Sequence, residues 1–255
     1  VILCLVGVIT VTTVDKSVTG ITENELFFFK QKTAYDINAS LEVYIQATVN
    51  MAANTQFENI CKVTGPGQNM MESPGYPEFL QTMKNVAAQD PENIMCSWIG
   101  DEDSDTCTDS NDWINDAGYD VETRDWWIAV QESQGPTLTA PYVDETTGLL
   151  VVSAVTPIYD SANGAMIGVA GLDFNVDSLY AMLKNYKLGE TGFYVLVSSD
   201  GTVIYHPNEK FRNINIADTD LSKNIQEAVK NKKAGEIVYT SGKDQCHGYL
   251  AEIGN

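Results

Sequence analysis

The order of apolar and polar positions predicts one long helix near the start of the chain. Leu41, Ile45, Val49 and Ala53 recur at every fourth position, which is the spacing of one face of an amphipathic helix. No proline interrupts this part of the chain, so nothing there blocks helical hydrogen bonding. We therefore expect a long N-terminal helix over residues 15–53.

Ahead of this helix, the chain opens on an apolar run that meets its first charge at Asp15. Residues 1–14 are fewer than the roughly 20 that span a bilayer. Because the run has neither an initiator Met nor a basic flank, we interpret it as the outer end of a truncated transmembrane helix, with a truncated signal peptide as the alternative. Further on, Phe27 to Tyr35 resembles the translation of a sequencing-adapter oligonucleotide, and we assign no function to residues 27–37.

Beyond residue 53, glycine and proline clusters break the chain and the period of the apolar positions changes to two. The first expected set comprises a helix at 78–88, strands at 94–99, 126–131, 149–158 and 165–174, and a helix at 179–186. Asn163-Gly164 predicts a hairpin between its last two strands. The second set comprises strands at 192–198 and 203–206, a helix at 220–231, and strands at 235–240 and 248–253.

This pattern predicts an α+β fold in which a long N-terminal helix is followed by two lobes with antiparallel sheets. The larger lobe is expected over residues 54–184 and the smaller over residues 188–255. The break between them is expected near Lys187-Leu188-Gly189.

Composition and charge narrow the classes of function. Hydrophobic residues make up 44% of the chain and charged ones 20%, which is typical of a globular protein. Fifteen Lys and Arg against 35 Asp and Glu give a net charge of −20. Such a surface repels phosphate backbones and anionic headgroups, so we expect no nucleic-acid partner.

The five cysteines are scattered and lack CxxC spacing, which supports neither a zinc site nor a redox motif. Cys96 and Cys107 flank an acidic turn. Two interpretations of this pair stay open, a disulfide of an extracytoplasmic domain and a pair of buried thiols.

Metal sites have equally little support. Asp101 to Asp105 begins like a calcium loop, but Thr106 stands where such a loop needs glycine and Asp112 where it needs glutamate. A solvated acidic hairpin is the better interpretation. The two histidines lack a partner at metal-ligand spacing, so we expect no metal and no other cofactor.

One arginine, several aromatic residues and two carboxylates gather between residues 118 and 175. The candidate site residues are Tyr119, Arg124, Trp126, Tyr142, Asp144 and Asp173. A ligand carboxylate is bound well by a guanidinium group together with Tyr and Trp donors. An ammonium group is bound well by carboxylates and aromatic faces. The set therefore predicts a binding site for a free α-amino acid, held at both charged ends.

The spacing of these residues resembles the amino-acid-binding motif of the double Cache sensory domains of bacterial and archaeal chemoreceptors and sensor kinases. The motif's carboxylate-binding element, Y-x4-R-x-W, is matched by Tyr119, Arg124 and Trp126. Its ammonium-binding elements, Y-x-D and G-x-D, are matched by Tyr142, Asp144 and Asp173. The resemblance covers about residues 38–253. It departs from the family at Trp127, where Tyr is frequent, and in stopping before the final strand and second membrane helix.

The resemblance implies PAS-like lobes and a non-enzymatic, membrane-anchored receptor, above all a methyl-accepting chemotaxis protein. Residues 54–184 would be the membrane-distal, amino-acid-binding lobe, and residues 188–255 the C-terminally truncated, membrane-proximal one. The resemblance also implies a homodimer whose domain lies in the periplasm or outside the cell. The alternatives are a histidine kinase or cyclic-dinucleotide enzyme as the output, and amines or carboxylates as the ligand.

A plainer interpretation accompanies each candidate residue. The Trp and Tyr residues can be core aromatics, which we favour for Trp127. Arg124 can be a surface residue paired with Glu122 or Asp125, and Asp144 can simply start a turn. As a rival function, an extracellular hydrolase would use the acidic residues, but a nearby arginine would lower the pKa of its acid.

Overall fold

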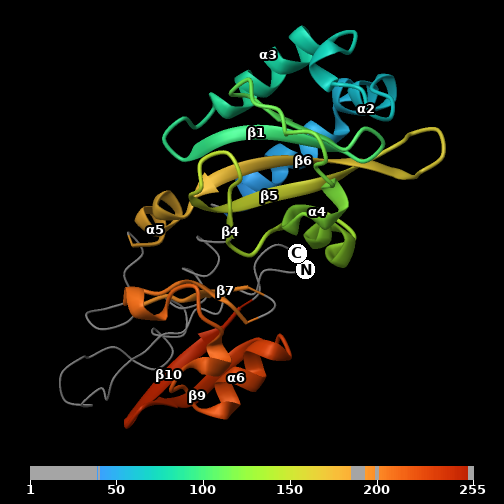
Figure 1. Ribbon diagram of the computed structural model, residues 1–255. Coiled ribbons are helices and arrows are strands. Elements are labelled where there is room, and N and C mark those ends of the chain that lie inside the picture. The colour runs from blue at the N-terminus through green and yellow to red at the C-terminus, as the bar shows by residue number, and fades with distance from the viewer. Residues whose placement is uncertain (1–38, 40, 185–192, 199–200, 252–255) are drawn as a thin grey trace. The chain divides into compact units, whose positions relative to one another are not determined.

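The computed structural model describes residues 39, 41–184, 193–198 and 201–251 (Figure 1). The apolar run at 1–14, the string at 27–37 and the expected break near 187–189 lie outside these residues. The described residues from 42 onward fall into two compact units, the N-terminal unit within residues 42–179 and the C-terminal unit within residues 180–255. Helices and antiparallel strands build both, so the expected α+β class is confirmed. No helix among the described residues is long and apolar enough to cross a membrane.

A six-stranded antiparallel sheet is the frame of the N-terminal unit. Its strands are β1 (Ile94–Asp101), β2 (Thr106–Asp109), β3 (Thr137–Leu138), β4 (Tyr142–Val143), β5 (Leu150–Tyr159) and β6 (Met166–Asn175). They run in the order β2-β1-β6-β5-β3, with β4 also paired to β5. The predicted hairpin joins β5 and β6, and its Gly164 has a φ of +76°, which glycine adopts without strain.

Helices cover one face of this sheet. They are the helix through residues 41–53, α2 (Thr55–Val63) and α3 (Tyr76–Ala87), with the short 3-10 turn η1 (Met70–Glu72) between the last two (Figure 1). The Thr48 and Thr156 hydroxyls are hydrogen-bonded at 2.8 Å between the first helix and β5. On β1, the Ser97 hydroxyl donates to the Met83 carbonyl of α3 at 2.7 Å.

The apolar stripe predicted for the first helix is correct only in its first half. Leu41 and Ile45 are buried, but Ala53 is exposed, and Thr48 and Met51 are buried farther along. A spacing of four residues advances about 40° beyond a full turn at each step, because a helix has 3.6 residues per turn. The buried face therefore follows steps of three and four residues.

The opposite sheet face is covered by α4 (Asp125–Ser133), which follows the 3-10 turn η2 (Val121–Thr123). The predicted strand at 126–131 is therefore wrong. Trp126 and Val130 are buried four residues apart, as on one helix face, whereas Ile128 between them is 44% exposed. A short apolar run does not by itself distinguish strand from helix.

The rest of the chain follows α5 (Val176–Lys184), which spans the division between the units. The further elements are β7 (Leu196–Val197), β8 (Val203–Tyr205), η3 (Glu209–Phe211), η4 (Ile216–Asp218), α6 (Lys223–Lys230), β9 (Gly235–Ser241) and β10 (Asp244–Leu250). β7 pairs with β8 and β9 with β10. Val197, Ile225 and Cys246 belong to the core of the C-terminal unit. β10 begins four residues before the strand predicted there.

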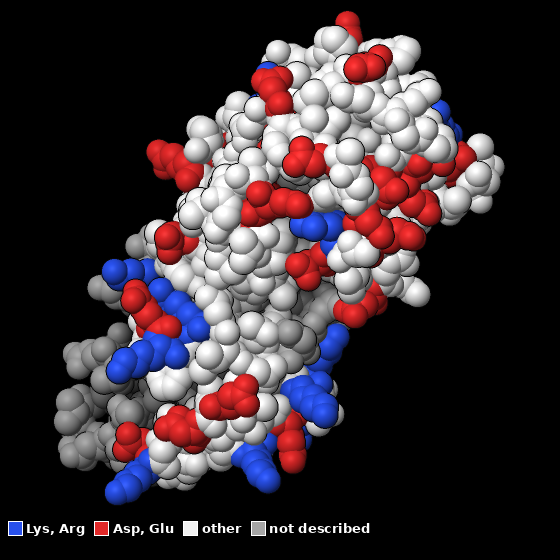
Figure 2. Space-filling view, viewed as in Figure 1, with Lys and Arg blue, Asp and Glu red and all other residues white. Residues whose placement is uncertain are grey.

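Charge is divided unequally between the two units. Residues 42–179 contain 22 Asp and Glu residues and only three basic ones, Lys62, Lys84 and Arg124. Residues 180–255 contain nine of each kind. Figure 2 shows the acidic side chains spread over the N-terminal unit with few basic groups among them. The net charge of residues 42–179 is therefore −19, against −20 for the whole chain.

Candidate functional site

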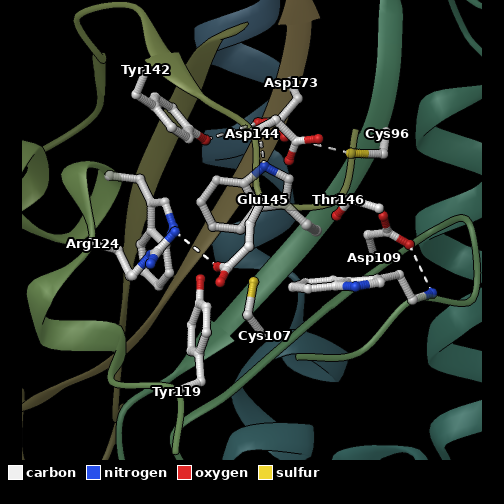
Figure 3. A pocket seen from close by; sticks show the side chains of 13 residues that line it. Cys96, Cys107, Asp109, Tyr119, Arg124, Tyr142, Asp144, Glu145, Thr146 and Asp173 are labelled. Atoms are coloured by element: carbon white, nitrogen blue, oxygen red, sulfur yellow. Dashed lines mark hydrogen bonds and ion pairs between the residues drawn. The ribbon is translucent and has the colours of Figure 1, made fainter. Parts of the chain in front are cut away.

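One pocket on the α4 side of the sheet brings all six predicted site residues together (Figure 3). They come from the loop before η2, the start of α4, the β4 strand and the turn after it, and β6. These segments meet because β4 and β6 both pair with β5, while α4 packs over the same sheet face.

Arg124 lies at the junction of η2 and α4, where it ends the first element and precedes the second. Its guanidinium carbon lies 4.8 Å from the centre of the Tyr119 ring, a cation–π contact. Its Nη2 atom lies 2.9 Å from Oε2 of Glu145. Arg124 therefore forms an ion pair inside the pocket, and neither Glu122 nor Asp125 is its partner.

Trp126 contributes a buried indole to the pocket wall from the first turn of α4. Its ring lies over Gly100 of β1, where any Cβ would overlap it, and 4.9 Å from the ring of Trp98. Trp127 points into the core and does not line the pocket, as the plainer interpretation predicts.

Asp173 lies on β6, between β1 and β5, and is 5% exposed. Its Oδ1 atom accepts hydrogen bonds from Trp98 Nε1 at 2.6 Å and from Ser153 Oγ at 2.5 Å. Longer contacts come from the Tyr142 hydroxyl at 3.5 Å and the Cys96 thiol at 3.6 Å. No ion pair to Asp173 occurs among the described residues.

The pKa of Asp173 is raised to about 6, chiefly because burial removes water from its charged form. The hydrogen bonds from Ser153 and Trp98 oppose this rise, and the charge of Asp144 adds to it. Asp173 is thus a buried carboxylate surrounded by neutral donors, and a cation in the pocket would stabilise its ionised form.

Tyr142 and Asp144 enter the pocket from the β4 edge. The Tyr142 hydroxyl is hydrogen-bonded to Ser153 at 2.7 Å. Oδ1 of Asp144 accepts a 2.7 Å hydrogen bond from the Thr147 backbone and a second from its hydroxyl. Both interpretations of Asp144 therefore hold in the structure, since it starts its turn and also lines the pocket.

Sequence reasoning missed the other residues that line the pocket, which are Cys96, Trp98, Cys107, Asp109, Trp113, Glu145 and Thr146. The period-two alternation could have found part of the set, because Cys96 and Trp98 share one face of β1. Asp109 lies opposite Trp98 on β2, and its Oδ1 accepts backbone hydrogen bonds from Asn111 and Trp113. Glu145 carries no such pattern, since it lies on an exposed turn.

Cys96 and Cys107 are free and buried, so the disulfide interpretation is wrong. The strand register explains this result, because Cys107 of β2 pairs with Gly100 and not with Cys96. Burial raises the pKa of both thiols above the usual range, which keeps them protonated.

The acidic turn between β1 and β2 is only partly solvated. Asp101 is fully buried and Ser104 nearly so, and their side chains are hydrogen-bonded to each other. Burial raises the pKa of Asp101 to about 6. The expectation of a wholly solvated hairpin is therefore wrong at these two residues. Among the described residues no group of three His, Cys, Asp or Glu side chains could hold a metal ion.

The pocket can thus hold a molecule with an anionic group at one end and a cationic group at the other. Arg124 and Tyr119 form the end that suits an anion. Asp173, Asp144 and Tyr142 form the end that suits a cation.

A family model described as a Cache domain matches residues 11–255. The methyl-accepting chemotaxis protein McpG of Pseudomonas putida is 26% identical over 178 residues, which make up 68% of this chain and 27% of McpG. The chain spans about a quarter or less of the length of the first curated relatives it matches.

The fold is shared with solved ligand-binding domains of bacterial chemoreceptors, including those of PctB and CtaA. The ligand-binding domain of the Pseudomonas aeruginosa amino acid chemoreceptor PctB, in complex with L-Gln, has a TM-score of 0.58 and 21% identity, and the match covers 90% of each chain. The ligand-binding domain of the Pseudomonas fluorescens chemoreceptor CtaA, in complex with L-alanine, has a TM-score of 0.59 and 21% identity. That match covers 90% of this chain and 96% of the CtaA domain.

Proposed function

Because the chain belongs to the Cache-domain family, we propose that it is the ligand-sensing part of a transmembrane chemoreceptor and binds a free α-amino acid in the N-terminal pocket. One observation carries the proposal: Arg124 and the buried Asp173 line the same pocket. A dipolar ligand satisfies both groups at once. The bound amino acids of the PctB and CtaA domains support this ligand class.

The ligand carboxylate is bound by Arg124, whose planar guanidinium forms two parallel hydrogen bonds to a carboxylate. The cation–π contact with Tyr119 fixes the guanidinium in position. Trp126 closes the wall beside it and excludes water. An ion pair in a partly dry pocket is stronger than the same pair in water.

The ligand ammonium group is bound by Asp173, Asp144 and Tyr142. Asp173 is held in place by Trp98 and Ser153, so little side-chain motion is lost when the ligand arrives. The ammonium group supplies the positive partner that Asp173 lacks among the described residues. Ionised Asp173 and the ligand therefore stabilise each other.

The signal leaves the pocket through β5. Ser153 on this strand contacts Asp173 on the pocket side, and Thr156 contacts Thr48 of the first helix on the other side. A ligand that binds one position of β5 better than another increases the population of that position, and the first helix moves together with β5. The membrane anchor at the N-terminus and homodimerisation through the long helix belong to the same proposal.

We place residues 54–184 away from the membrane and residues 188–255 near it, on the extracytoplasmic side. The division of charge supports this orientation. Residues 42–179 carry 22 acidic and three basic residues, whereas residues 180–255 carry nine of each. Anionic lipid headgroups repel the first composition more than the second.

The proposed module is not an enzyme. A hydrolase would use two carboxyl groups of the pocket and would have no need of Arg124. In an amine sensor Arg124 would likewise be dispensable. Both rivals therefore differ from the proposal at this residue. The chemoreceptor output is favoured over a histidine kinase or a cyclic-dinucleotide enzyme because McpG and the other first curated relatives are methyl-accepting chemotaxis proteins.

Calorimetric titration of the protein against the twenty amino acids, several amines and several organic acids tests the proposal. We expect one-to-one binding at roughly micromolar dissociation constants, which correspond to about −8 kcal/mol. Binding should be lost when either the α-carboxylate or the α-ammonium of the ligand is blocked, and in the Arg124→Ala variant. Retained affinity in that variant would reject the pocket assignment.

A further inference from the structure

Glu145 already occupies the anion-binding end of the pocket. Its side chain crosses the pocket and brings its carboxylate to Arg124, beside the Tyr119 ring (Figure 3). The distance from Glu145 Oε2 to Arg124 Nη2 is 2.9 Å, that of a charge-assisted hydrogen bond. This carboxylate therefore sits where the proposed ligand's own carboxylate is to be bound.

We propose that Glu145 is a built-in competitor of the ligand carboxylate and thereby a specificity-determining residue of this pocket. The inference rests on the proposed function, because it takes Arg124 as the group that binds the ligand carboxylate. A ligand must displace Glu145 from Arg124 in order to bind. Only a ligand that brings a carboxylate of its own replaces the lost ion pair.

The turn that carries Glu145 does not depend on its ion pair. Asp144 holds this turn by accepting two hydrogen bonds from Thr147, and its backbone pairs with Leu149 and Gly148. Gly148 has a φ of +68°, which suits this tight turn. The Glu145 side chain is 49% exposed and can rotate into water without breaking the turn.

Arg124 is the only basic residue that could hold a ligand carboxylate in this unit, which the structure describes throughout. Lys62 is paired with Glu58 and Asp160, and Lys84 with Asp112. Neither lysine lines the pocket. Glu145 therefore competes for a single cationic group, Arg124, and removing Glu145 leaves only Arg124 without its ion-pair partner.

The competitor has a defined effect on selectivity. A simple amine gains Asp173 but leaves the Arg124–Glu145 pair intact, so Glu145 does not affect its binding. A simple carboxylate must break this pair and gains nothing at Asp173. An α-amino acid replaces one ion pair and gains another, and of the three it alone engages both ends. Glu145 therefore lowers the affinity for simple carboxylates and for α-amino acids alike; an amino acid offsets this loss through Asp173, whereas a simple carboxylate does not, so Glu145 selects against ligands that bring only a carboxylate.

The test compares Glu145→Gln with Glu122→Gln. Both changes remove one negative charge from an exposed glutamate near Arg124, but Glu122 does not line the pocket. For an amino acid that the unchanged protein binds, Glu145→Gln should tighten calorimetric affinity roughly two- to fivefold, because a partly exposed ion pair contributes little. Glu122→Gln should leave the affinity unchanged. Equal or weaker affinity in Glu145→Gln would overturn the inference.

A second measurement does not depend on amino-acid binding. Propionate added to Glu145→Gln should perturb the tryptophan fluorescence through Trp126 at concentrations roughly two- to fivefold lower than in Glu122→Gln and in the unchanged protein. No response in Glu145→Gln, or a response at the same concentrations in all three proteins, would contradict the competitor role even if no amino acid is bound. If propionate binds more tightly to Glu145→Gln and no amino acid binds to any variant, the competitor is supported and the amino-acid function fails.

Discussion

The indole Nε1 of Trp98 donates a 2.6 Å hydrogen bond to Oδ1 of Asp173 on the neighbouring strand. In the register of β1 and β6, Trp98 lies opposite Gly171, two residues before Asp173. Because Gly171 has no side chain, the indole occupies the space that a Cβ would take and reaches the carboxylate. The glycine of the G-x-D element is thus required for space, and it orients the aspartate through the tryptophan.

Gly171→Ala should destabilise the N-terminal unit and weaken ligand binding. A Cβ at this position overlaps the Trp98 ring, which is 3% exposed, so the indole has to shift. Such overpacking costs roughly 1–3 kcal/mol of the free energy of unfolding. Urea unfolding measures this cost. Gly135→Ala is the control, because a Cβ there meets nothing within 4 Å. Equal stability of the two variants would show that the indole moves freely.

Ligand affinity should fall as the pH is lowered through the pKa of Asp173, which is about 6. The proposed ammonium group binds the ionised carboxylate, so a proton must leave before binding below that pH. Between pH 7 and pH 5 the expected loss is about tenfold for a single carboxyl. Titration in buffers of different ionisation enthalpy measures the proton release. The Asp101→Asn variant should keep this dependence on pH. An affinity that does not change between pH 7 and pH 5 would contradict the prediction.

The free energy of unfolding should rise as the pH falls from 7 to 5. The pKa values of Asp101 and Asp173 are both raised from 3.8 to about 6 by burial. The folded state then binds protons more tightly than the unfolded state, so this stability is complete below pH 4 and is lost as pH rises through 6. The gain at pH 5 is about 1 kcal/mol per carboxyl. The double variant Asp101→Asn/Asp173→Asn should lack this gain in the free energy of unfolding, which urea unfolding at pH 7 and pH 5 measures. An equal gain in the double variant would mean that other groups cause it.

Much of the pocket could be predicted because its motif residues lie close together along the chain. Arg124 and Trp126 are two residues apart, and Tyr142 and Asp144 likewise. The β5–β6 hairpin follows from its turn and its alternation. Short-range patterns of this kind can be recognised in the sequence without knowledge of the tertiary contacts.

The missed parts depend on long-range register and on packing. Cys96 and Asp173 lie 77 residues apart in sequence, and only the pairing of β1 with β6 brings them together. The helix α4 was predicted as a strand because five apolar residues carry too little periodicity. Glu145 was missed because it pairs with Arg124 only through the position of the turn after β4 in the folded unit. The sequence around Glu145 contains no pattern that predicts this position.

Arg124→Lys should weaken amino-acid binding at least roughly tenfold although the charge is kept. An ammonium group cannot form the two parallel hydrogen bonds that a guanidinium forms with a carboxylate. Calorimetry of the variant measures the loss. The chain offers a matched control in Arg212→Lys, which changes the other arginine, packed on Tyr180 in the C-terminal unit. Similar affinities in both variants would show that Arg124 acts only as a distant charge.

The pocket should also discriminate by the charge of the ligand's side chain. Apart from the residues proposed to bind the α-carboxylate and the α-ammonium group, the pocket wall contains Cys96, Cys107 and Asp109, all buried. Burial raises the pKa of Asp109, and backbone hydrogen bonds from Trp113 and Asn111 oppose this rise. A second carboxylate on the ligand would face Asp109 and Asp144 with no cation left, because Arg124 holds the α-carboxylate.

Asparagine and glutamine should therefore bind at least roughly tenfold more tightly than aspartate and glutamate, since like charges at close range in a partly dry site repel strongly. Each pair has nearly the same shape, so calorimetric titration of the two pairs isolates the charge. Asp109→Asn should narrow the gap, whereas Asp116→Asn, at an exposed position outside the pocket, should leave it unchanged. Equal binding of acids and amides by the unchanged protein would mean that the ligand side chain points away from Asp109 and towards solvent.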